Sequence, residues 1–269
     1  MADNRAIGVF DSGLGGLTCV KEIMKIMPNE DVIYFGDTGR VPYGTRERDT
    51  LLKYVRQDIR FLETFDIKMI IIACGTASSA ALPWISSEFG TEIIGVVEPA
   101  VRAAVKATKS KRIGVLGTSG TIKSGKYPEF IKNICPDAEV FQKACPMFVP
   151  LVENGYTDCE VTKIIAREYL EEIKKNDIDT LILGCTHYPL LKSVIGEIMG
   201  DGVTLIDSGA AAADFAFEQL KARDMLSDKS DGSYSYYVSD SAADFAKLGG
   251  IFLTRPIDES VGKVDIERY

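Results

Sequence analysis

Two cysteines, each with a threonine within two residues, stand at the ends of apolar runs. Cys74 follows the run 69–73, and Cys185 follows the run 180–184. A free thiol has a pKa of about 8.5, so modest stabilisation at neutral pH produces a thiolate. A thiolate on one face of a carbon stereocentre could remove a proton, and a thiol on the opposite face could deliver one. The pair therefore predicts proton transfer at carbon, which needs no redox change, no metal and no cofactor.

The single histidine limits the other reactions open to these thiols. A cysteine hydrolase needs a thiol paired with a histidine base that a third group orients. His187 lies two residues after Cys185, and no comparable base accompanies Cys74. An inert buried thiol is the usual state of a lone cysteine after an apolar strand, but two matched cysteines weaken that interpretation. The other cysteines show no C-x-x-C spacing, so we expect reduced thiols rather than a disulfide or zinc site at Cys19, Cys135, Cys145 and Cys159.

A glycine-rich segment, 11–16, follows the first apolar run. It lacks the lysine of a P-loop and does not match G-x-G-x-x-G, so phosphate binding is disfavoured. Its glycines allow a tight turn that brings Ser12 and backbone N–H groups toward a small anion such as a carboxylate. Asp11 could lie near a thiol or a substrate ammonium group. Helix capping by Asp11 or Ser12 is the simpler alternative.

Two further polar segments could complete a binding site. Pro42, Tyr43 and Gly44 belong to a segment that is too polar and glycine-rich for a core element, and such loops often close over ligands. Thr118 and Thr121 add hydroxyl groups at an expected helix start. They could bind a carboxylate or simply cap the helix.

Short β-branched runs that alternate with amphipathic segments must position these groups. The alternation predicts an α/β fold with mainly parallel sheets flanked by helices. We expect strands near 7–10, 31–36, 68–73, 92–97, 112–116, 138–142, 180–184, 203–206 and 234–238, the last before a short helix. Two apolar stripes at helical spacing should pack on the sheets: Leu51, Val55, Ile59 and Leu62, and Val161, Ile165 and Ile173 with Ile164 and Leu170.

The candidate polar residues share one position, directly after an expected strand. Strand ends leave side chains and helix N–H groups pointing into a crevice, which is where α/β proteins bind ligands. The residues in this position are Asp11, Asp37, Cys74, Glu98, Thr118, Cys185 and Asp207.

An internal echo indicates a duplicated α/β unit. The segment 7–13 and the segment 113–120 share an apolar run followed by polar and glycine residues. We therefore expect two pseudo-symmetric lobes, each a mainly parallel sheet flanked by helices, with the active site between them. The lobes would be 1–97 together with 208–269, and 98–207.

Composition excludes several classes of partner. The chain has 269 residues, of which 46% are hydrophobic, enough for a substantial core. Its formal charge of −8 argues against a surface for nucleic acid or anionic membrane. No apolar stretch approaches the length of a membrane span and no signal peptide begins the chain, so we expect a cytoplasmic protein.

Five segments taken together resemble the glutamate racemases of the aspartate/glutamate racemase family. They are Asp11-Ser12-Gly13, Pro42-Tyr43-Gly44, Ala73-Cys74-x-Thr76-Ala77-Ser78, Gly117-Thr118 with Thr121, and Leu183-Gly184-Cys185-Thr186-His187-Tyr188-Pro189. The likeness covers about 7–220, and the last segment is its most specific part. It implies a homodimeric, cofactor-independent enzyme that interconverts L- and D-glutamate and supplies D-glutamate for peptidoglycan synthesis. It also implies two α/β lobes with the active site between them.

The same resemblance implies roles for individual residues. Cys74 would be the base for the D-substrate and Cys185 the base for the L-substrate, with Asp11 and His187 as their respective helpers. The substrate's amino and carboxylate groups would be held by Ser12, Pro42, Tyr43, Gly44, Thr76, Thr118, Thr121 and Thr186, with Glu153 beside the amino group.

Gly75 departs from the family pattern, in which asparagine follows the first cysteine and offers its amide to the substrate. A hydrogen bond to a charged group contributes about 1.5–3 kcal/mol, so we expect reduced activity that asparagine at this position would raise. Two alternatives stay open: a racemase for aspartate or another acidic amino acid, and a catalytically weakened amino-acid-binding protein.

Overall fold

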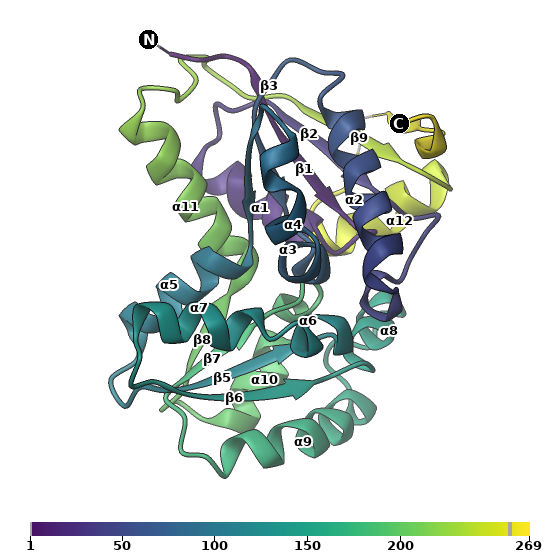
Figure 1. The fold of residues 1–269 in the computed structure, drawn as a ribbon. Helices are drawn as coiled ribbons and strands as arrows, with labels where there is room; N and C mark the ends of the chain where they lie inside the picture. Colours follow the sequence, from purple (N-terminus) through teal and green to yellow (C-terminus); the bar gives the residue numbers. More distant parts are fainter. Residues whose placement is uncertain (1, 258–259) are drawn as a thin grey trace.

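Two separate parallel sheets organise the chain, one in each lobe (Figure 1). The computed structural model describes residues 2–257 and 260–269. The first sheet has the strand order β10-β9-β2-β1-β3-β4, and the second has the order β6-β5-β7-β8. The strands are β1 (Ala6–Asp11), β2 (Val32–Gly36), β3 (Ile67–Ile72), β4 (Glu92–Gly95), β5 (Arg112–Gly117), β6 (Glu139–Ala144), β7 (Thr180–Leu183), β8 (Thr204–Asp207), β9 (Tyr234–Val238) and β10 (Val261–Lys263).

The two sheets repeat one topology, which confirms the predicted fold class. The order β2-β1-β3-β4 in the first sheet matches β6-β5-β7-β8 in the second, and the strand pairs are parallel. Cys74 therefore follows β3 at the position where Cys185 follows β7, and Asp11 ends β1 where Thr118 follows β5. Because the carboxyl ends of both sheets carry the polar residues, one substrate between the lobes can contact both sets.

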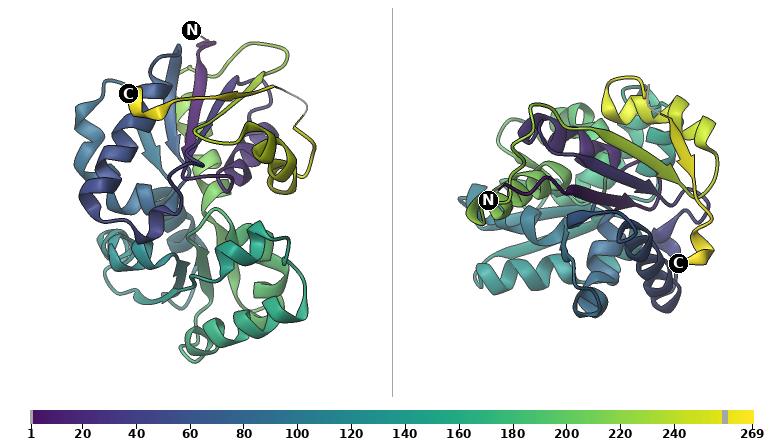
Figure 2. Two further views of the ribbon diagram at one scale, coloured as in Figure 1. Left: turned by 90° about the vertical axis from the view of Figure 1, so that its right-hand side faces the viewer. Right: turned by 90° about the horizontal axis from the view of Figure 1, so that it is seen from above.

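Helices cover both sheets and connect the lobes (Figures 1 and 2). The α-helices are α1 (Leu17–Ile26), α2 (Arg48–Leu62), α3 (Gly75–Ala80), α4 (Leu82–Ile85), α5 (Val97–Ala107), α6 (Ser119–Lys123), α7 (Lys126–Ile134), α8 (Phe148–Glu153), α9 (Glu160–Lys174), α10 (Lys192–Met199), α11 (Ser208–Ala222) and α12 (Ala242–Leu253). Short 3-10 turns are η1 (Tyr43–Thr45), η2 (Ser86–Glu88), η3 (Tyr188–Leu191) and η4 (Ile266–Arg268).

The first predicted helical stripe is buried as expected, and the second is only partly so. The buried face of α2 includes all four residues of that stripe, Leu51, Val55, Ile59 and Leu62. On α9, Leu170 and Ile173 are buried, but Val161 is 51% exposed and Ile164 is 55% exposed, so the prediction was wrong for those two. The reason is that small side chains, Thr162 and Ala166, continue the buried face of α9 toward its start.

Helices α5 and α11 pack against each other where the chain passes between the lobes, and α11 also packs on α1 (Figure 1). Asp207, which ends β8, accepts hydrogen bonds from the N–H groups of Gly209 and Ala210 and so caps α11. The aspartate at this strand end therefore serves to cap a helix and does not point to a ligand in the crevice.

A buried ion pair ties the amino end of the first sheet together. Lys68 Nζ lies 2.6 Å from Glu30 Oε2, and the two side chains are 0% and 2% exposed. Lys68 Nζ also donates to the carbonyls of Asp3, at 2.6 Å, and Met225, at 2.7 Å. The ammonium group thus has three partners in an environment where an unpaired charge would be strongly unfavourable.

The last part of the chain differs most from expectation. The predicted strand at 234–238 is present, but the helix after it has 12 residues, and β10 beyond it was not foreseen. Across the part of the chain that the structure describes, no helix combines the length and apolar character required to cross a bilayer.

Candidate active site

A cavity of about 360 Å³ lies between the lobes at the carboxyl ends of both sheets. The residues predicted for the site line it, with the exception of Thr121. They are Asp11, Ser12, Pro42, Tyr43, Gly44, Cys74, Gly75, Thr76, Thr118, Glu153, Cys185, Thr186 and His187. Three strand-end residues, Asp37, Glu98 and Asp207, do not line it: Asp37 is buried behind the wall, Glu98 pairs with Arg102 on α5, and Asp207 caps α11.

The Cys74 thiol occupies a site that favours the neutral form. Cys74 precedes the first turn of α3, is 5% exposed, and has its Sγ 3.8 Å from Ser12 Oγ. Burial and the nearby Asp11 carboxylate raise the pKa of the Cys74 thiol to about 12, against the opposing contacts of Ala77 N–H and the Ser12 hydroxyl. In the ligand-free protein Cys74 therefore carries its proton at neutral pH and can act as an acid.

The Cys185 thiol faces a different neighbour. Its Sγ lies 3.9 Å from His187 Nδ1, and His187 Nε2 lies 3.1 Å from Glu153 Oε1. Burial disfavours the His187 cation, but the contacts with Cys185 and Glu153 outweigh that effect and raise the pKa of His187 to about 10. An imidazolium beside Cys185 stabilises a thiolate there. The two thiols thus have different charged neighbours, a carboxylate near Cys74 and an imidazolium beside Cys185.

Asp11 adds a buried carboxylate between the two sulfur environments. It is 1% exposed, and its Oδ2 accepts a hydrogen bond of 3.1 Å from Gly13 N–H. Burial raises the pKa of Asp11, while the His187 charge and the backbone N–H groups of the glycine-rich turn oppose that rise. Asp11 Oδ1 has no hydrogen-bond partner among the described residues. This oxygen could accept a hydrogen bond from the ammonium group of a substrate.

Three threonines bring hydroxyl groups from both lobes together. Thr76 Oγ1 lies 2.9 Å from Thr118 Oγ1, and Thr118 Oγ1 lies 3.0 Å from Thr121 Oγ1. Thr118 also caps α6 through the N–H of Thr121. We predicted that Thr121 would contact the substrate directly. In this structure Thr121 is fully buried behind the other two threonines and does not line the cavity. Thr121 instead supports the two hydroxyls that line the wall.

Tyr43 lines the cavity without offering its hydroxyl to it. The side chain is 1% exposed, and its hydroxyl forms a short hydrogen bond with Asp37 and a 2.8 Å hydrogen bond with Asp58. A substrate contact from Tyr43 would therefore have to come from its backbone or ring. Sequence alone could not separate these cases, because the two carboxylates that accept from the hydroxyl lie in different elements, Asp37 after β2 and Asp58 in α2.

Gly75 stands where the lobes meet. A Cβ built on Gly75 would lie 2.4 Å from the carbonyl oxygen of Gly184, in the opposite lobe. Similarly, a Cβ on Gly120 would lie 2.8 Å from the carbonyl oxygen of Gly44. Any side chain at position 75 therefore requires the Gly184 carbonyl or the start of α3 to shift. Asparagine at this position would bring its amide only together with such a shift, so its effect on activity stays a prediction.

One wall of the cavity is apolar and was not predicted. It consists of Val41, Pro146, Val149 and Pro150. The last three lie shortly after the carboxyl end of β6, at the same edge of the second sheet as Cys185. They lack polar groups, which is why they gave no chemical signal.

The cavity contains no fixed cation of the usual kind. Among the described residues that line it, none is lysine or arginine. An anionic substrate must therefore be held by backbone N–H groups, hydroxyls and His187. Within the described ranges, no three His, Cys, Asp or Glu side chains gather in a way that could hold a metal ion.

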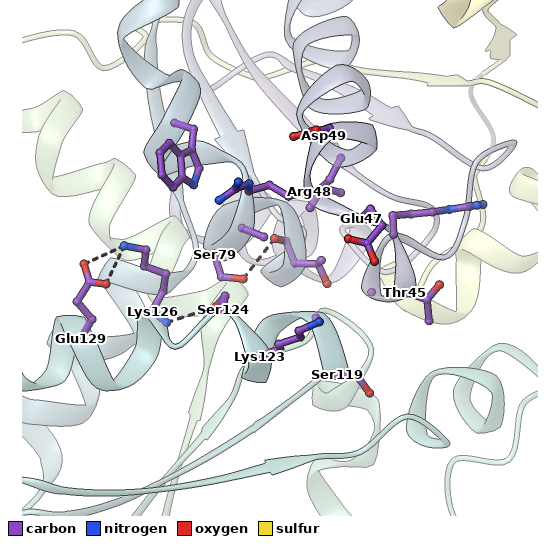
Figure 3. Close-up of a pocket in the computed structure, with 17 residues that line it drawn as sticks. Thr45, Glu47, Arg48, Asp49, Ser79, Ser119, Lys123, Ser124, Lys126 and Glu129 are labelled. Carbon is purple, nitrogen blue, oxygen red and sulfur yellow. Dashed lines mark hydrogen bonds and ion pairs between the residues drawn. The ribbon is translucent and has the colours of Figure 1, made fainter.

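A wider cleft of about 790 Å³ opens beside the cavity and shares its wall at Gly44, Thr45, Thr76 and Ser119 (Figure 3). Arg48 and Asp49 come from the start of α2 above it, and Lys123 and Lys126 come from the lower lobe. Lys126 pairs with Glu129 at 2.7 Å, and the Arg48 guanidinium lies 5.0 Å from the ring centre of the exposed Trp84. The cleft and the cavity therefore lie side by side, separated by these four residues.

Comparison with known proteins gives consistent matches. Residues 24–216 match the family model described as Asp/Glu/Hydantoin racemase. A curated glutamate racemase from Geobacter metallireducens is 49% identical over 250 residues, which cover 93% of each chain.

Solved structures agree in fold over nearly the whole chain. A glutamate racemase from Bacillus anthracis superposes with a TM-score of 0.94 at 37% identity and 98% coverage of each chain. A glutamate racemase from Francisella tularensis, solved with D-glutamate, superposes with a TM-score of 0.92 at 37% identity, covering 99% of this chain and 100% of that one.

Proposed function

This chain belongs to the Asp/Glu/Hydantoin racemase family, and from that premise we propose that it interconverts L- and D-glutamate by two-base proton transfer at Cα, with two thiols as the bases. The observation that carries the proposal is that Cys74 and Cys185 follow equivalent strands of two lobes with the same topology and line the same cavity. Such a pair can address one carbon from two directions.

The reaction from L-glutamate begins with Cys185 as thiolate and Cys74 as thiol. The Cys185 sulfur takes the Cα proton, an S–H bond forms, and the electron pair of the broken C–H bond moves into the α-carboxylate. The Cys74 thiol then delivers its proton to the opposite face of Cα. D-glutamate leaves behind a Cys185 thiol and a Cys74 thiolate, so protons and charge balance.

The D-substrate uses the reverse assignment. Cys74 must start as thiolate, which its burial and the Asp11 carboxylate disfavour in the ligand-free protein. The ammonium group of a bound amino acid beside Asp11 would offset that carboxylate charge. Substrate binding itself would then prepare Cys74 for its role as base.

Backbone and hydroxyl donors would hold the charged groups of the substrate. Ser12, Thr76, Thr118 and Thr186 line the cavity with hydroxyls, and Gly44 contributes backbone from the loop after Pro42. Charge that develops on the α-carboxylate during proton removal is stabilised by donors fixed in a site with little water. Asp11 and Glu153 are the acceptors for the ammonium group.

We infer further that the D-glutamate enters peptidoglycan synthesis, as the family resemblance implies. A cytoplasmic location remains a prediction from the sequence, and a homodimeric assembly remains what the family resemblance implies. Size-exclusion chromatography with light scattering tests the assembly directly.

Racemisation in deuterated water tests the proposal. Circular dichroism should follow conversion of each glutamate enantiomer to the racemate, and deuterium should enter Cα during turnover. Replacing either thiol, Cys74→Ser or Cys185→Ser, should lower kcat at least about 100-fold, the scale of one acid–base group. Cys135→Ser, at a cysteine outside the cavity, is the matched control.

Three outcomes would overturn the proposal. Normal racemisation by both serine variants would remove the two-thiol mechanism. Faster conversion of aspartate than of glutamate would change the substrate. Calorimetric binding of glutamate without exchange at Cα would identify an amino-acid-binding protein instead of an enzyme.

A further inference from the structure

Beneath the cavity loop 41–45 lies a buried cluster of charged side chains that the proposed reaction does not use. Arg40 directly precedes the loop, Asp37 follows β2, and Asp58 comes from the second half of α2. Both aspartates are fully buried, and the Arg40 side chain is 10% exposed. The Tyr43 hydroxyl, at the centre of the loop, reaches into this cluster.

Arg40 holds both carboxylates in fixed positions. Its Nε lies 2.7 Å from Asp37 Oδ2, and its Nη2 lies 2.9 Å from Asp58 Oδ1. Nη1 donates to Gln57 Oε1 at 2.5 Å and reaches the exposed Glu267 at 3.3 Å. The guanidinium also lies 4.1 Å from the ring centre of Tyr54, whose ring is tilted against that of Tyr43 at a centre distance of 5.7 Å. These contacts leave the guanidinium little freedom to move.

The hydrogen bonds of this cluster require one proton more than ionised aspartates supply. The Tyr43 oxygen lies within hydrogen-bond distance of Asp37 Oδ2 and 2.8 Å from Asp58 Oδ2, yet a phenol has a single proton to donate. With both carboxylates ionised, one of the two contacts would be a repulsion between lone pairs, and the cluster would carry a net negative charge away from water. One added proton removes both difficulties.

Asp58 is the better holder of that proton, because its Oδ2 contacts only the Tyr43 hydroxyl among the described residues, whereas Asp37 Oδ2 also accepts a hydrogen bond from Arg40 Nε at 2.7 Å. Burial, and after it the charge of Asp37, place the pKa of Asp58 well above its ordinary value, although Arg40 and Tyr43 oppose the rise. The groups that face Asp58 are Asp37, Arg40 and Tyr43. In the resulting arrangement, Asp58 donates to the Tyr43 oxygen, and Tyr43 donates to Asp37.

We propose that Asp58 is a protonated positioning residue, which acts through Tyr43 to hold the loop 41–45 in the shape that lines the cavity. The proposal rests on the proposed function only for its kinetic consequence. Because Tyr43, Gly44 and Thr45 line the cavity, loss of this support should loosen the backbone donors of the loop and weaken substrate binding more than the chemical step.

Two substitutions of similar size separate this role from alternatives. In Asp58→Asn the amide can donate to Tyr43 and accept from Arg40, so it reproduces the protonated acid. We expect its kcat and KM to stay within about threefold of the wild type, with an unchanged pH profile. In Asp58→Leu neither hydrogen bond is possible, so we expect KM to rise about tenfold or more while kcat changes less. Near-ultraviolet circular dichroism and thermal melting establish that both variants fold.

Infrared spectroscopy gives a readout that does not depend on activity. The difference spectrum between wild type and Asp58→Asn at pH 7 should contain the carbonyl stretch of a protonated carboxyl group. Its absence would overturn the proton assignment even if the chain racemises glutamate. If Asp58→Asn is as impaired as Asp58→Leu, the position needs an anion, and if Asp58→Leu keeps its KM, Asp58 does not position the loop; either result refutes the proposal. A wild type that carries the band but does not racemise would refute the proposed function alone.

Discussion

Replacing Gly75 by alanine adds one carbon atom at a point where the two lobes touch. That Cβ would lie 2.4 Å from the Gly184 carbonyl oxygen, whereas ordinary contacts begin at 3.4 Å, so a separation of about 1 Å must open. Gly75 directly follows Cys74, and Gly184 directly precedes Cys185. We therefore expect the added atom to move the two thiols apart.

A displacement of this size should be visible in the kinetics. Misplacing reacting groups by about 1 Å can cost about 100-fold in rate, which corresponds to about 2.7 kcal/mol of activation free energy. We expect Gly75→Ala to lower kcat between about 10- and 100-fold in the circular dichroism assay. Gly75→Asn carries the same Cβ and adds an amide whose hydrogen bond to a charged substrate contributes about 1.5–3 kcal/mol. Its activity should therefore lie above that of the alanine variant without exceeding the wild type.

Gly90→Ala is the matched control, because a Cβ at Gly90 meets no atom within 4 Å. It should leave kcat and KM unchanged. Wild-type activity in Gly75→Ala would mean that the contact with Gly184 does not set the thiol separation. An asparagine variant that surpasses the wild type would restore our first interpretation, in which only the missing amide matters.

Two further predictions concern charge. Lys68→Met should lower the free energy of unfolding by about 3–5 kcal/mol, because it leaves Glu30 buried without its partner. The double variant Lys68→Met with Glu30→Gln should recover part of that loss. Urea unfolding measures both variants, and a loss below about 1 kcal/mol in Lys68→Met would contradict a stabilising role for the buried pair. Above pH about 10, His187 loses its proton and can no longer support a thiolate at Cys185, so kcat/KM should fall there for both L- and D-glutamate. In Glu153→Gln this fall should begin at lower pH, because the carboxylate that stabilises the imidazolium is gone. A pH profile unaffected by the substitution would exclude Glu153 as the partner of His187.

Much of the fold followed from local patterns. The β-branched runs located the strands of both lobes, and the echo between 7–13 and 113–120 anticipated their shared topology. The late β10 escaped detection because three residues carry too little periodic signal. Val161 and Ile164 were misassigned because a helical stripe does not indicate which of two adjacent faces will meet the sheet.

The site was predictable in position but less so in detail. The rule that polar residues gather at the carboxyl ends of parallel strands located both thiols and most of their neighbours. It could not reveal that the Tyr43 hydroxyl turns away toward Asp37 and Asp58, since these partners are distant in sequence. Nor could it reveal the contact across the lobes at Gly75, which exists only once both lobes are placed.

The different neighbours of the two sulfurs have a consequence for the measured constants. Cys74 sits beside Ser12 and Asp11, while Cys185 sits beside His187 and Glu153. Enantiomers have equal free energies in water, so the Haldane relation fixes the ratio of kcat/KM for forward and reverse turnover at unity, however unequal the two sides are. The asymmetry can therefore change kcat and KM only together: the enantiomer with the higher KM must also have the higher kcat, in the same proportion.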